Sequence, residues 1–310
     1  MRTLVTGGAG FIGSHVADAL LQAGHDVLIV DNLSSGRLEN VPKKAELAKI
    51  DVGSPEVERV IDDYKPAAIF HHAAQIDVRK SVQDPIFDAA VNVVGTARVA
   101  SAAARAGAQV LVFASSGGAI YGEQHRHPAD EEHPTKPLSP YGTAKLCGEQ
   151  YVSYFARTSS LRTVALRYGN VYGPRQDRHG EAGVVAIFCG RILQNEPLVI
   201  FGDGRQTRDF VFVEDVVRAN LRALDNTMAR GCYNIGTGLE TDINAIAQQL
   251  LAAAKCKIAL RHEAAKSGEQ RRSVISPDHA KSELGWTPEV NLRDGLARTY
   301  AWFAEQAKAR

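Results

Sequence analysis

A tyrosine and a lysine four residues apart are the side chains of this sequence best suited to acid–base chemistry. Tyr141 and Lys145 stand at the start of a segment predicted as a helix over Gly142–Thr158, after the loop Pro134–Pro140. Residues four apart share one face of a helix, so the phenol and the ammonium can approach the same ligand. A nearby positive charge lowers the pKa of a phenol, and a phenolate is a general base. Because the pattern is frequent by chance, an exposed helical pair is the alternative interpretation.

A glycine-rich run near the N-terminus predicts a site for a dinucleotide. The run Gly7-Gly8-Ala9-Gly10-Phe11-Ile12-Gly13 follows the apolar strand Leu4–Thr6 and fits both GxGxxG and GxxGxxG. Glycines permit a tight turn and a close approach of backbone N–H groups to phosphate, and the following helix directs the positive end of its dipole at the anion. Asp31 is the residue after the next strand, and its carboxylate would accept hydrogen bonds from the ribose hydroxyls and repel a 2′-phosphate. We therefore expect NAD, although Arg37 nearby leaves NADP open.

Strands and helices alternate through the first half of the chain. Short apolar runs predict buried parallel strands at Leu4–Thr6, Asp26–Val30, Leu47–Ile50, Ala67–His71, Gln109–Ala114 and Thr163–Arg167. Helical patterns fall at Gly13–Ala23, Pro55–Tyr64, Ile86–Ala106 and Gly142–Thr158. Repeated βαβ units predict an α/β fold of the Rossmann type, with a doubly wound parallel sheet and the ligand at the carboxyl ends of its strands.

The pattern changes after residue 170, where glycine-containing turns separate shorter elements. Further helices are expected near Glu214–Leu224, Ile243–Ala254 and Leu292–Lys308. We predict a dinucleotide-binding domain over residues 1–170 and a smaller α/β substrate lobe over residues 171–310, with some exchange of chain between the two. Since no linker separates the halves, a cleft between them is the natural place for a substrate.

Composition argues against several classes of function. The 310 residues carry a net charge of +1, with 23% charged residues and no basic cluster, which argues against a nucleic-acid partner. The four cysteines form no CxxC pair and the ten histidines show no metal-ligand spacing, so we expect reduced thiols and no metal. No apolar run reaches the roughly 18 residues of a membrane span, and the first strand leaves no room for a signal peptide. We expect a cytoplasmic protein without a membrane partner.

Taken together, these motifs resemble the extended short-chain dehydrogenase/reductase family over nearly the whole chain, and within it the UDP-glucose 4-epimerases. The segments that carry the resemblance are Thr6–Gly13, Asp31-Asn32, Asp51-Val52, His72–Gln75, Asn92–Thr96, Ser115–Gly122, Tyr141 with Lys145, Arg167–Pro174 and Arg208–Phe210. As a set they are much more specific than any single motif. The resemblance implies NAD as cofactor and a UDP-sugar as substrate.

The resemblance also implies roles for individual residues. Catalysis is implied for Tyr141 and Lys145, and Ser116 is our candidate for a third catalytic residue. Cofactor contacts are implied for Gly7, Gly10, Phe11, Ile12, Gly13, Asp31, Asn32, Ser35, Gly36, Asp51, Val52, Ala73, Ala74, Gln75, Asn92, Ser115, Tyr141, Lys145 and Tyr168. Substrate contacts are implied for Ser116, Gly117, Tyr141, Asn170, Gly183, Val184, Ile200, Phe201, Arg208, Lys266, Glu269 and Ser273.

The mechanism implied by the resemblance leaves no net redox change. The Tyr141 phenolate takes the proton of the sugar 4-hydroxyl while the C4 hydride passes to NAD, and after the 4-keto sugar turns, the hydride returns to its other face. NAD therefore has no reason to leave between turnovers. A homodimer through Ile86–Ala106 and Gly142–Thr158 is also implied.

One departure from the family pattern lies next to the expected base. The family carries Ser or Thr four residues before the tyrosine of its xYG turn, and counted from Tyr121 this position is Gly117. The usual interval to the catalytic tyrosine is reached from Ser116 instead, although loop length can vary. We hypothesise that Ser116 donates the hydrogen bond to the reacting sugar oxygen, while a structural serine at a strand end is the alternative.

A second departure lies in the segment expected to bind the nucleotide. Lys266-Ser267-Gly268-Glu269 stands where the family commonly shows Arg-x-Gly-Asp, which keeps the charge and loses the bidentate geometry. Ser273 is small at a position where some members carry a bulky aromatic that restricts the sugar pocket. We expect N-acetylated UDP-hexosamines to be accepted along with UDP-glucose and UDP-galactose.

Three other functions are alternatives for this sequence. A nucleotide-sugar 4,6-dehydratase would need an Asp-Glu pair where this chain has Gly118-Ala119, which argues strongly against elimination. A UDP-glucuronate epimerase or decarboxylase would need a cation or hydroxyl near the sugar carboxylate, and this alternative stays open. A non-catalytic NAD-binding regulator is favoured by Gly117 and opposed by the presence of both Tyr141 and Lys145.

Overall fold

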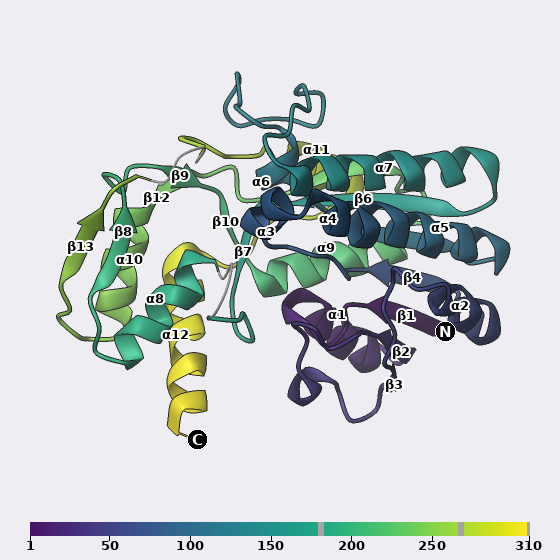
Figure 1. Cartoon of the computed structure of the whole chain (residues 1–310), viewed down its shortest axis with the longest axis horizontal. Helices are drawn as coiled ribbons and strands as arrows, with labels where there is room; N and C mark the ends of the chain where they lie inside the picture. Colours follow the sequence, from purple (N-terminus) through teal and green to yellow (C-terminus); the bar gives the residue numbers. More distant parts are fainter. Residues whose placement is uncertain (179–182, 266–269, 309–310) are drawn as a thin grey trace.

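A sheet of seven parallel strands forms the centre of the computed structural model, which describes residues 1–178, 183–265 and 270–308 (Figure 1). The strand order is β11-β6-β5-β4-β1-β2-β3. The strands are β1 (Arg2–Thr6), β2 (Asp26–Val30), β3 (Glu46–Ala48), β4 (Ala68–His71), β5 (Val110–Ser116), β6 (Arg162–Tyr168) and β11 (Gly231–Ile235). The predicted Rossmann-type doubly wound parallel sheet is confirmed.

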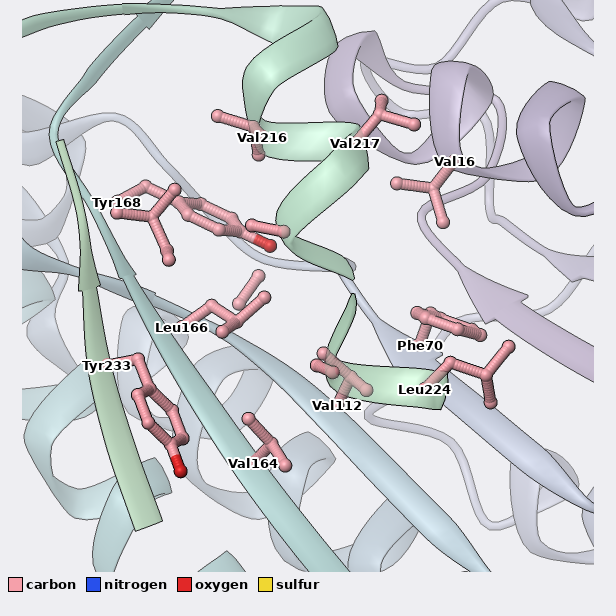
Figure 2. Close-up of a cluster of buried hydrophobic side chains, with 14 of the residues drawn as sticks. Val16, Phe70, Val112, Val164, Leu166, Tyr168, Val216, Val217, Leu224 and Tyr233 are labelled. Atoms are coloured by element: carbon pink, nitrogen blue, oxygen red, sulfur yellow. The ribbon is translucent and has the colours of Figure 1, made fainter. Parts of the chain in front are cut away.

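The apolar runs form strands because both faces of the sheet are covered by helices. Successive side chains of a strand point to opposite faces, so a run such as Val110–Ala114 supplies two cores at once. One core lies against α1 (Phe11–Gln22), α9 (Val213–Asp225) and α11 (Asp278–Leu284), and the other against α2 (Glu56–Tyr64), α5 (Gly95–Arg105) and α7 (Pro140–Thr158). Figure 2 shows the first core, where Val16, Val216 and Val217 lie over side chains of the sheet.

Three elements of this part of the fold come from beyond residue 170, namely β11, α9 and α11. Strand β11 pairs with β6, and α9 packs on α1, β5 and β6. The apolar pattern predicts six strands and does not reveal β11, because its sequence Gly-Cys-Tyr-Asn-Ile mixes polar and apolar residues. The division into domains at residue 170 stays a prediction, with the chain crossing between the two parts.

The segment expected as one helix over Ile86–Ala106 is divided. It consists of α4 (Pro85–Ala89), a π-helical turn η2 (Ala90–Val94) and α5. The extra residue of a π turn alters the direction of the side chains within a helix. Asn92 lies in this turn, and its amide reaches the backbone of Gln75 in another segment. Such π turns are frequent at functional sites.

The remaining elements form a second lobe with its own apolar core, drawn away from the large sheet in Figure 1. Its elements are β7 (Asn170–Tyr172), α8 (Val184–Leu193), β8 (Leu198–Phe201), β9 (Thr207–Arg208), β10 (Phe210–Phe212), β12 (Thr241–Asp242), α10 (Ile243–Ala253), β13 (Leu260–Glu263) and α12 (Leu292–Lys308). Three short helical segments elsewhere are η1 (Leu38–Asn40), α3 (Val78–Gln83) and α6 (Gly117–Ile120). Among the described residues no helix is long and apolar enough to cross a membrane.

Candidate functional site

The turn between β1 and α1 is packed so closely that it requires glycine. Gly7 has a φ of +69°, and a Cβ at this position would lie 2.6 Å from the backbone nitrogen of Ala73. A Cβ at Gly13 would lie 2.2 Å from the carbonyl oxygen of Gly7. Helix α1 carries no acidic residue in its first turn, and Gly10 at its N-cap has no side chain to cover the first N–H groups. These groups form a site for an anion such as a pyrophosphate.

A cavity of about 590 Å³ extends from this turn to the start of α7. The predicted cofactor residues that line it are Gly7, Gly10, Phe11, Ile12, Gly13, Asp31, Asn32, Ser35, Asp51, Val52, Ala73, Ala74, Gln75, Ser115, Tyr141, Lys145 and Tyr168. Gly36 and Asn92 are not among its lining residues. Gly36 packs against Asp31, where a Cβ would lie 2.7 Å from the carboxylate. The volume is within the range of small-molecule sites.

The carboxylate of Asp31 lines the cavity where β2 ends. Asp31 is buried, and it accepts hydrogen bonds from the N–H groups of Ala9 at 3.0 Å and Leu33 at 2.8 Å. Arg37, the residue that left NADP open, donates to Asp177 at 3.0 Å and also pairs with Glu39. Because carboxylates already hold the guanidinium, this wall favours an unphosphorylated ribose.

Asn92 holds the segment that follows β4 against the cavity. Its Oδ1 accepts from the backbone N–H of Gln75 at 2.9 Å, and its Nδ2 donates to the carbonyl of Gln75 at 2.8 Å. The same Nδ2 donates to Asp88 at 3.0 Å. Asn92 therefore acts on the backbone of the cavity wall and does not itself line the cavity.

The buried His71 ties the same wall to the sheet. Its ring nitrogens meet the hydroxyls of Thr6 at 2.6 Å and Thr96 at 3.0 Å. Thr96 uses its proton on the carbonyl of Asn92, so it must accept from His71 Nε2. The ring is thus neutral with its proton on Nε2, and burial together with the charge of Lys145 lowers the pKa of His71 to about 3.

Two serines fix the start of α7, the helix that carries Tyr141. Ser139 is the N-cap and accepts from the N–H of Gly142 at 3.1 Å. Ser81 of α3 accepts from the N–H of Tyr141 at 3.2 Å. Pro140 occupies the first helical position, where its missing N–H is of no consequence. Tyr141 therefore enters the cavity wall from a helix end that is held from two sides.

Tyr141, Ser116 and Lys145 meet where β5 and α7 approach each other. Burial raises the pKa of Tyr141 to about 12, and a hydrogen bond with the Ser116 side chain opposes the rise. Burial lowers the pKa of Lys145 to about 8, which the carboxylates of Asp88 and Glu149 oppose. Lys145 donates to the carbonyl of Ala114 at 2.9 Å, with its Nζ 6.0 Å from the centre of the Tyr141 ring.

The net shift of the Tyr141 pKa is upward, opposite to the expected lowering, because burial is the largest effect. Among the described residues, Ser116 is the one that lowers this pKa, and desolvation outweighs it. The structure also distinguishes between Ser116 and Gly117 as the position for the assisting hydroxyl. A Cβ at Gly117 would lie 2.8 Å from Ile275 Cδ1 and 3.2 Å from the carbonyl oxygen of Arg167, so this position has little room for a serine.

The predicted substrate residues lie mainly outside this cavity, on the side of the second lobe. Gly183, at the N-cap of α8, lines the cavity, and Val184 follows it as the first residue of α8. Asn170 opens β7, with its Oδ1 3.4 Å from where a Cβ of Gly118 would lie. Arg208 donates to the carbonyls of Thr207 at 2.8 Å and Gln270 at 2.9 Å.

The other predicted substrate positions differ in how they are placed. Ile200 is buried in the core of the second lobe, and Phe201 ends β8 beside it. Ser273 is buried, with 3% of its surface exposed. Lys266 and Glu269 lie outside the described residues.

Sequence reasoning missed several lining residues of the cavity. They include the polar residues Lys80, Arg175, Gln176 and Asp177. The last three follow β7 and are brought back to the first lobe by the ion pairs of Arg175 with Asp18 at 2.7 Å and of Asp177 with Arg37 at 3.0 Å. No local spacing marks residues that are joined across so much of the chain, and the Gly173-Pro174 turn is the only nearby signal.

Comparisons with known proteins agree with this geometry. The pattern of the NAD dependent epimerase/dehydratase family matches residues 3–236. The UDP-glucose 4-epimerase of Mycolicibacterium smegmatis is 44% identical over 313 residues, which cover 99% of this chain and 100% of that protein.

Two solved structures are similar over the full length. The UDP-glucose 4-epimerase of Thermotoga maritima with UDP-glucose has a TM-score of 0.95 and 43% identity, covering 99% of this chain and 100% of that one. The UDP-glucose 4-epimerase of Thermus thermophilus in complex with NAD has a TM-score of 0.93 and 42% identity, covering 98% of this chain and 99% of that one. A family match over most of the chain, joined to these identities, means that the chain belongs to the NAD dependent epimerase/dehydratase family.

Proposed function

We propose that this chain is a UDP-glucose 4-epimerase, which inverts C4 of a UDP-hexose with the help of bound NAD. The observation that carries the proposal is that Tyr141 and Lys145, one helical turn apart on α7, both line the dinucleotide cavity, with Ser116 beside the phenol. The full-length likeness to UDP-glucose 4-epimerases supports the same activity. A regulator without chemistry would have no use for a buried phenol paired with a hydroxyl and a lysine.

The walls of the cavity fit NAD. The closely packed glycines would hold the pyrophosphate at the start of α1, Asp31 would hold the adenosine ribose, and Asp51 and Val52 would border the adenine. When bound, NAD supplies the acceptor and later the donor of the hydride, and its positive ring favours the phenolate of Tyr141.

The protein's own groups handle the proton. Tyr141 takes the proton of the sugar 4-hydroxyl, and Ser116 donates a hydrogen bond to the same oxygen as its charge develops. Lys145, with a pKa of about 8, is mainly protonated at pH 7 and keeps a positive charge near the base. After the sugar has turned, Tyr141 returns the proton to the oxygen at C4.

The test is turnover of UDP-glucose and UDP-galactose by the purified protein with NAD, followed by a coupled assay specific for one sugar. We expect interconversion in both directions without added oxidant or reductant. A fraction of the enzyme should also show the absorbance of reduced nicotinamide when a UDP-hexose is added. A folded protein that retains NAD and interconverts neither sugar would overturn the proposal, and turnover of UDP-glucuronate alone would favour the uronate alternative.

We also propose that the chain acts as a homodimer in the cytoplasm. Apolar side chains are exposed on adjacent helical segments, with Val82 of α3 exposed by 62%, Ile86 of α4 by 80% and Tyr154 of α7 by 49%. Exposed apolar side chains on neighbouring helices suit contact with a partner. All four cysteines are free, which suits a reducing compartment. Sedimentation should give a dimer for the wild type and a monomer for Ile86→Glu, and a monomeric wild type would contradict the dimer.

A further inference from the structure

A buried ion pair lies one helical turn beyond the proposed active-site lysine. Tyr141, Lys145 and Glu149 follow each other at intervals of four residues on α7, and therefore share one face of the helix. Glu149 Oε1 accepts from Arg167 Nε at 2.9 Å, and Oε2 accepts from Arg167 Nη2 at 2.7 Å. Both side chains are more than nine-tenths buried. The ion pair is therefore bidentate, which fixes the orientation of both side chains.

The pair is joined to the strand that carries Ser116. Ser115, the residue before it on β5, donates from its hydroxyl to Glu149 Oε1 at 2.5 Å. Arg167 of β6 donates from Nη1 to the hydroxyl of Tyr121 at 2.9 Å. Tyr121 in turn donates to Asn234 of β11 at 2.7 Å. The contacts thus connect α7 with the end of β5 and with β6. Through Tyr121, the residue after α6, they continue to β11.

Stability alone does not account for an ion pair at this position. Removing two charges from water is costly, and buried pairs can often be replaced by well-packed apolar side chains without loss of stability. What apolar contacts do not provide is direction. A carboxylate held at both oxygens by one guanidinium and at one oxygen by a hydroxyl can satisfy all three bonds in a single placement of α7 against β5.

We propose that Glu149 and Arg167 are positioning residues, which set the rotation and height of α7 so that the hydroxyls of Tyr141 and Ser116 meet. The inference rests on the proposed function, because it gives those two hydroxyls their part in the reaction. Glu149 acts through the helix that carries Tyr141, and through Ser115 on the strand that carries Ser116. A displacement of about 1 Å between groups that share a proton is enough to slow a reaction by about 100-fold.

The main test replaces both charges together. Either single substitution, Glu149→Met or Arg167→Met, leaves an unpaired buried charge and should lower the melting temperature. The double variant Glu149→Met/Arg167→Met should regain most of that loss. We expect its kcat on UDP-glucose to stay about 10- to 100-fold below that of the wild type, with KM and NAD content little changed. A purely structural pair would give a double variant that recovers both stability and kcat, and this result would overturn the proposal.

A matched control comes from the same strand. Arg162 is a buried arginine at the opposite end of β6, where it donates to carbonyls of Ala223 and Leu224 at the end of α9. Arg162→Met should lower the melting temperature and leave the kcat of the folded protein unchanged. A fall in kcat as large as that of the double variant would mean that any defect in β6 impairs turnover, and would also contradict the proposal.

A smaller change keeps the test decisive if the double variant does not fold. Ser115→Ala removes the hydroxyl that joins β5 to Glu149, and Ser115→Thr restores one; because Ser115 also lines the cavity, kcat is compared at equal NAD content. We expect kcat to fall about 10-fold for the alanine variant, the loss of one hydrogen bond to a charged group, and to recover for the threonine variant. Equal kcat for all three proteins would refute the link. The wild type is measured in the same assay. An inactive wild type would refute the proposed function, whereas an active wild type with equally active variants would refute the positioning role alone.

Discussion

The Ser116→Ala substitution gives the sharpest test of the proposed active site. Ser116 is the side chain that opposes the burial-driven rise of the Tyr141 pKa to about 12. Removing it takes one hydrogen bond from a phenol that must become an anion. A bond to a charged group is worth about 1.5–3 kcal/mol, which corresponds to about 10- to 150-fold in rate. We therefore expect kcat to fall by that factor.

The assay follows kcat, KM and pH dependence separately. Ser116 meets Tyr141 and does not line the dinucleotide cavity, so NAD content should match that of the wild type. The pKa of Tyr141 should rise, because a group that lowers it is gone, and the alkaline shift should appear in the pH profile of kcat/KM. Ser116→Thr should retain most of the activity.

Gly117→Ser in the Ser116→Ala background completes the test. A Cβ at Gly117 would come within 2.8 Å of Ile275 Cδ1, and the residue does not meet Tyr141 as Ser116 does. We expect no rescue from a hydroxyl placed there. An unchanged kcat in Ser116→Ala would remove Ser116 from the mechanism, and recovery through Gly117→Ser would return the role to the position counted from Tyr121.

Four further outcomes are expected. Gly13→Ala should weaken NAD retention by more than about 10-fold, measured as cofactor released from the purified protein, because its Cβ would lie 2.2 Å from the carbonyl oxygen of Gly7. The pKa of His71 is about 3 in the folded protein and near 6.5 in the unfolded chain, so the free energy of unfolding of the wild type should fall by about 2 kcal/mol from pH 8 to pH 5. Urea unfolding of His71→Gln should show a fall that is smaller by about this amount. Lys145→Met should abolish turnover and raise the melting temperature at pH 7, because burial disfavours the charged amine. The wild type should turn over UDP-N-acetylglucosamine, as the small Ser273 predicts.

Each of these outcomes has a result that contradicts it. Full NAD content in Gly13→Ala would mean that the turn can relax. The sign for His71 follows from a lowered pKa, so that stability is complete above pH 6.5 and is lost toward pH 3, and equal slopes for variant and wild type would exclude the histidine. A less stable Lys145→Met would show that the bond to Ala114 outweighs desolvation. No product from UDP-N-acetylglucosamine would end the prediction based on Ser273.

The parts of the fold that the sequence predicts are those with unbroken local signals. Val110–Ala114 is recognisable as a strand because it is apolar on both faces. Strand β11 is not, because Asn234 is buried within it and finds its partners Tyr121 and Ala129 only in the folded chain. The helix over Ile86–Ala106 keeps its apolar pattern through η2, and the amide of Asn92 explains the π turn only when Gln75 is placed beside it.

The candidate site divides in the same way. Gly7, Gly13 and Asp31 are predictable because their spacing within one βαβ unit determines where they lie. Arg37 is recognisable as a possible phosphate ligand, but its pairing with Asp177 depends on a loop from the other lobe. The elevated pKa of Tyr141 likewise depends on burial, which a pair of residues four apart on a helix does not reveal.

The position of β11 at the edge of the sheet affects how the chain folds during its synthesis. When the ribosome has released the chain as far as β6, that strand has an unpaired edge, and the apolar face that α9 later covers is open to solvent. The nascent chain must wait for much of the second lobe before this layer closes. We therefore expect the growing polypeptide to bind chaperones during that interval, and a gene cut after residue 170 to yield insoluble protein.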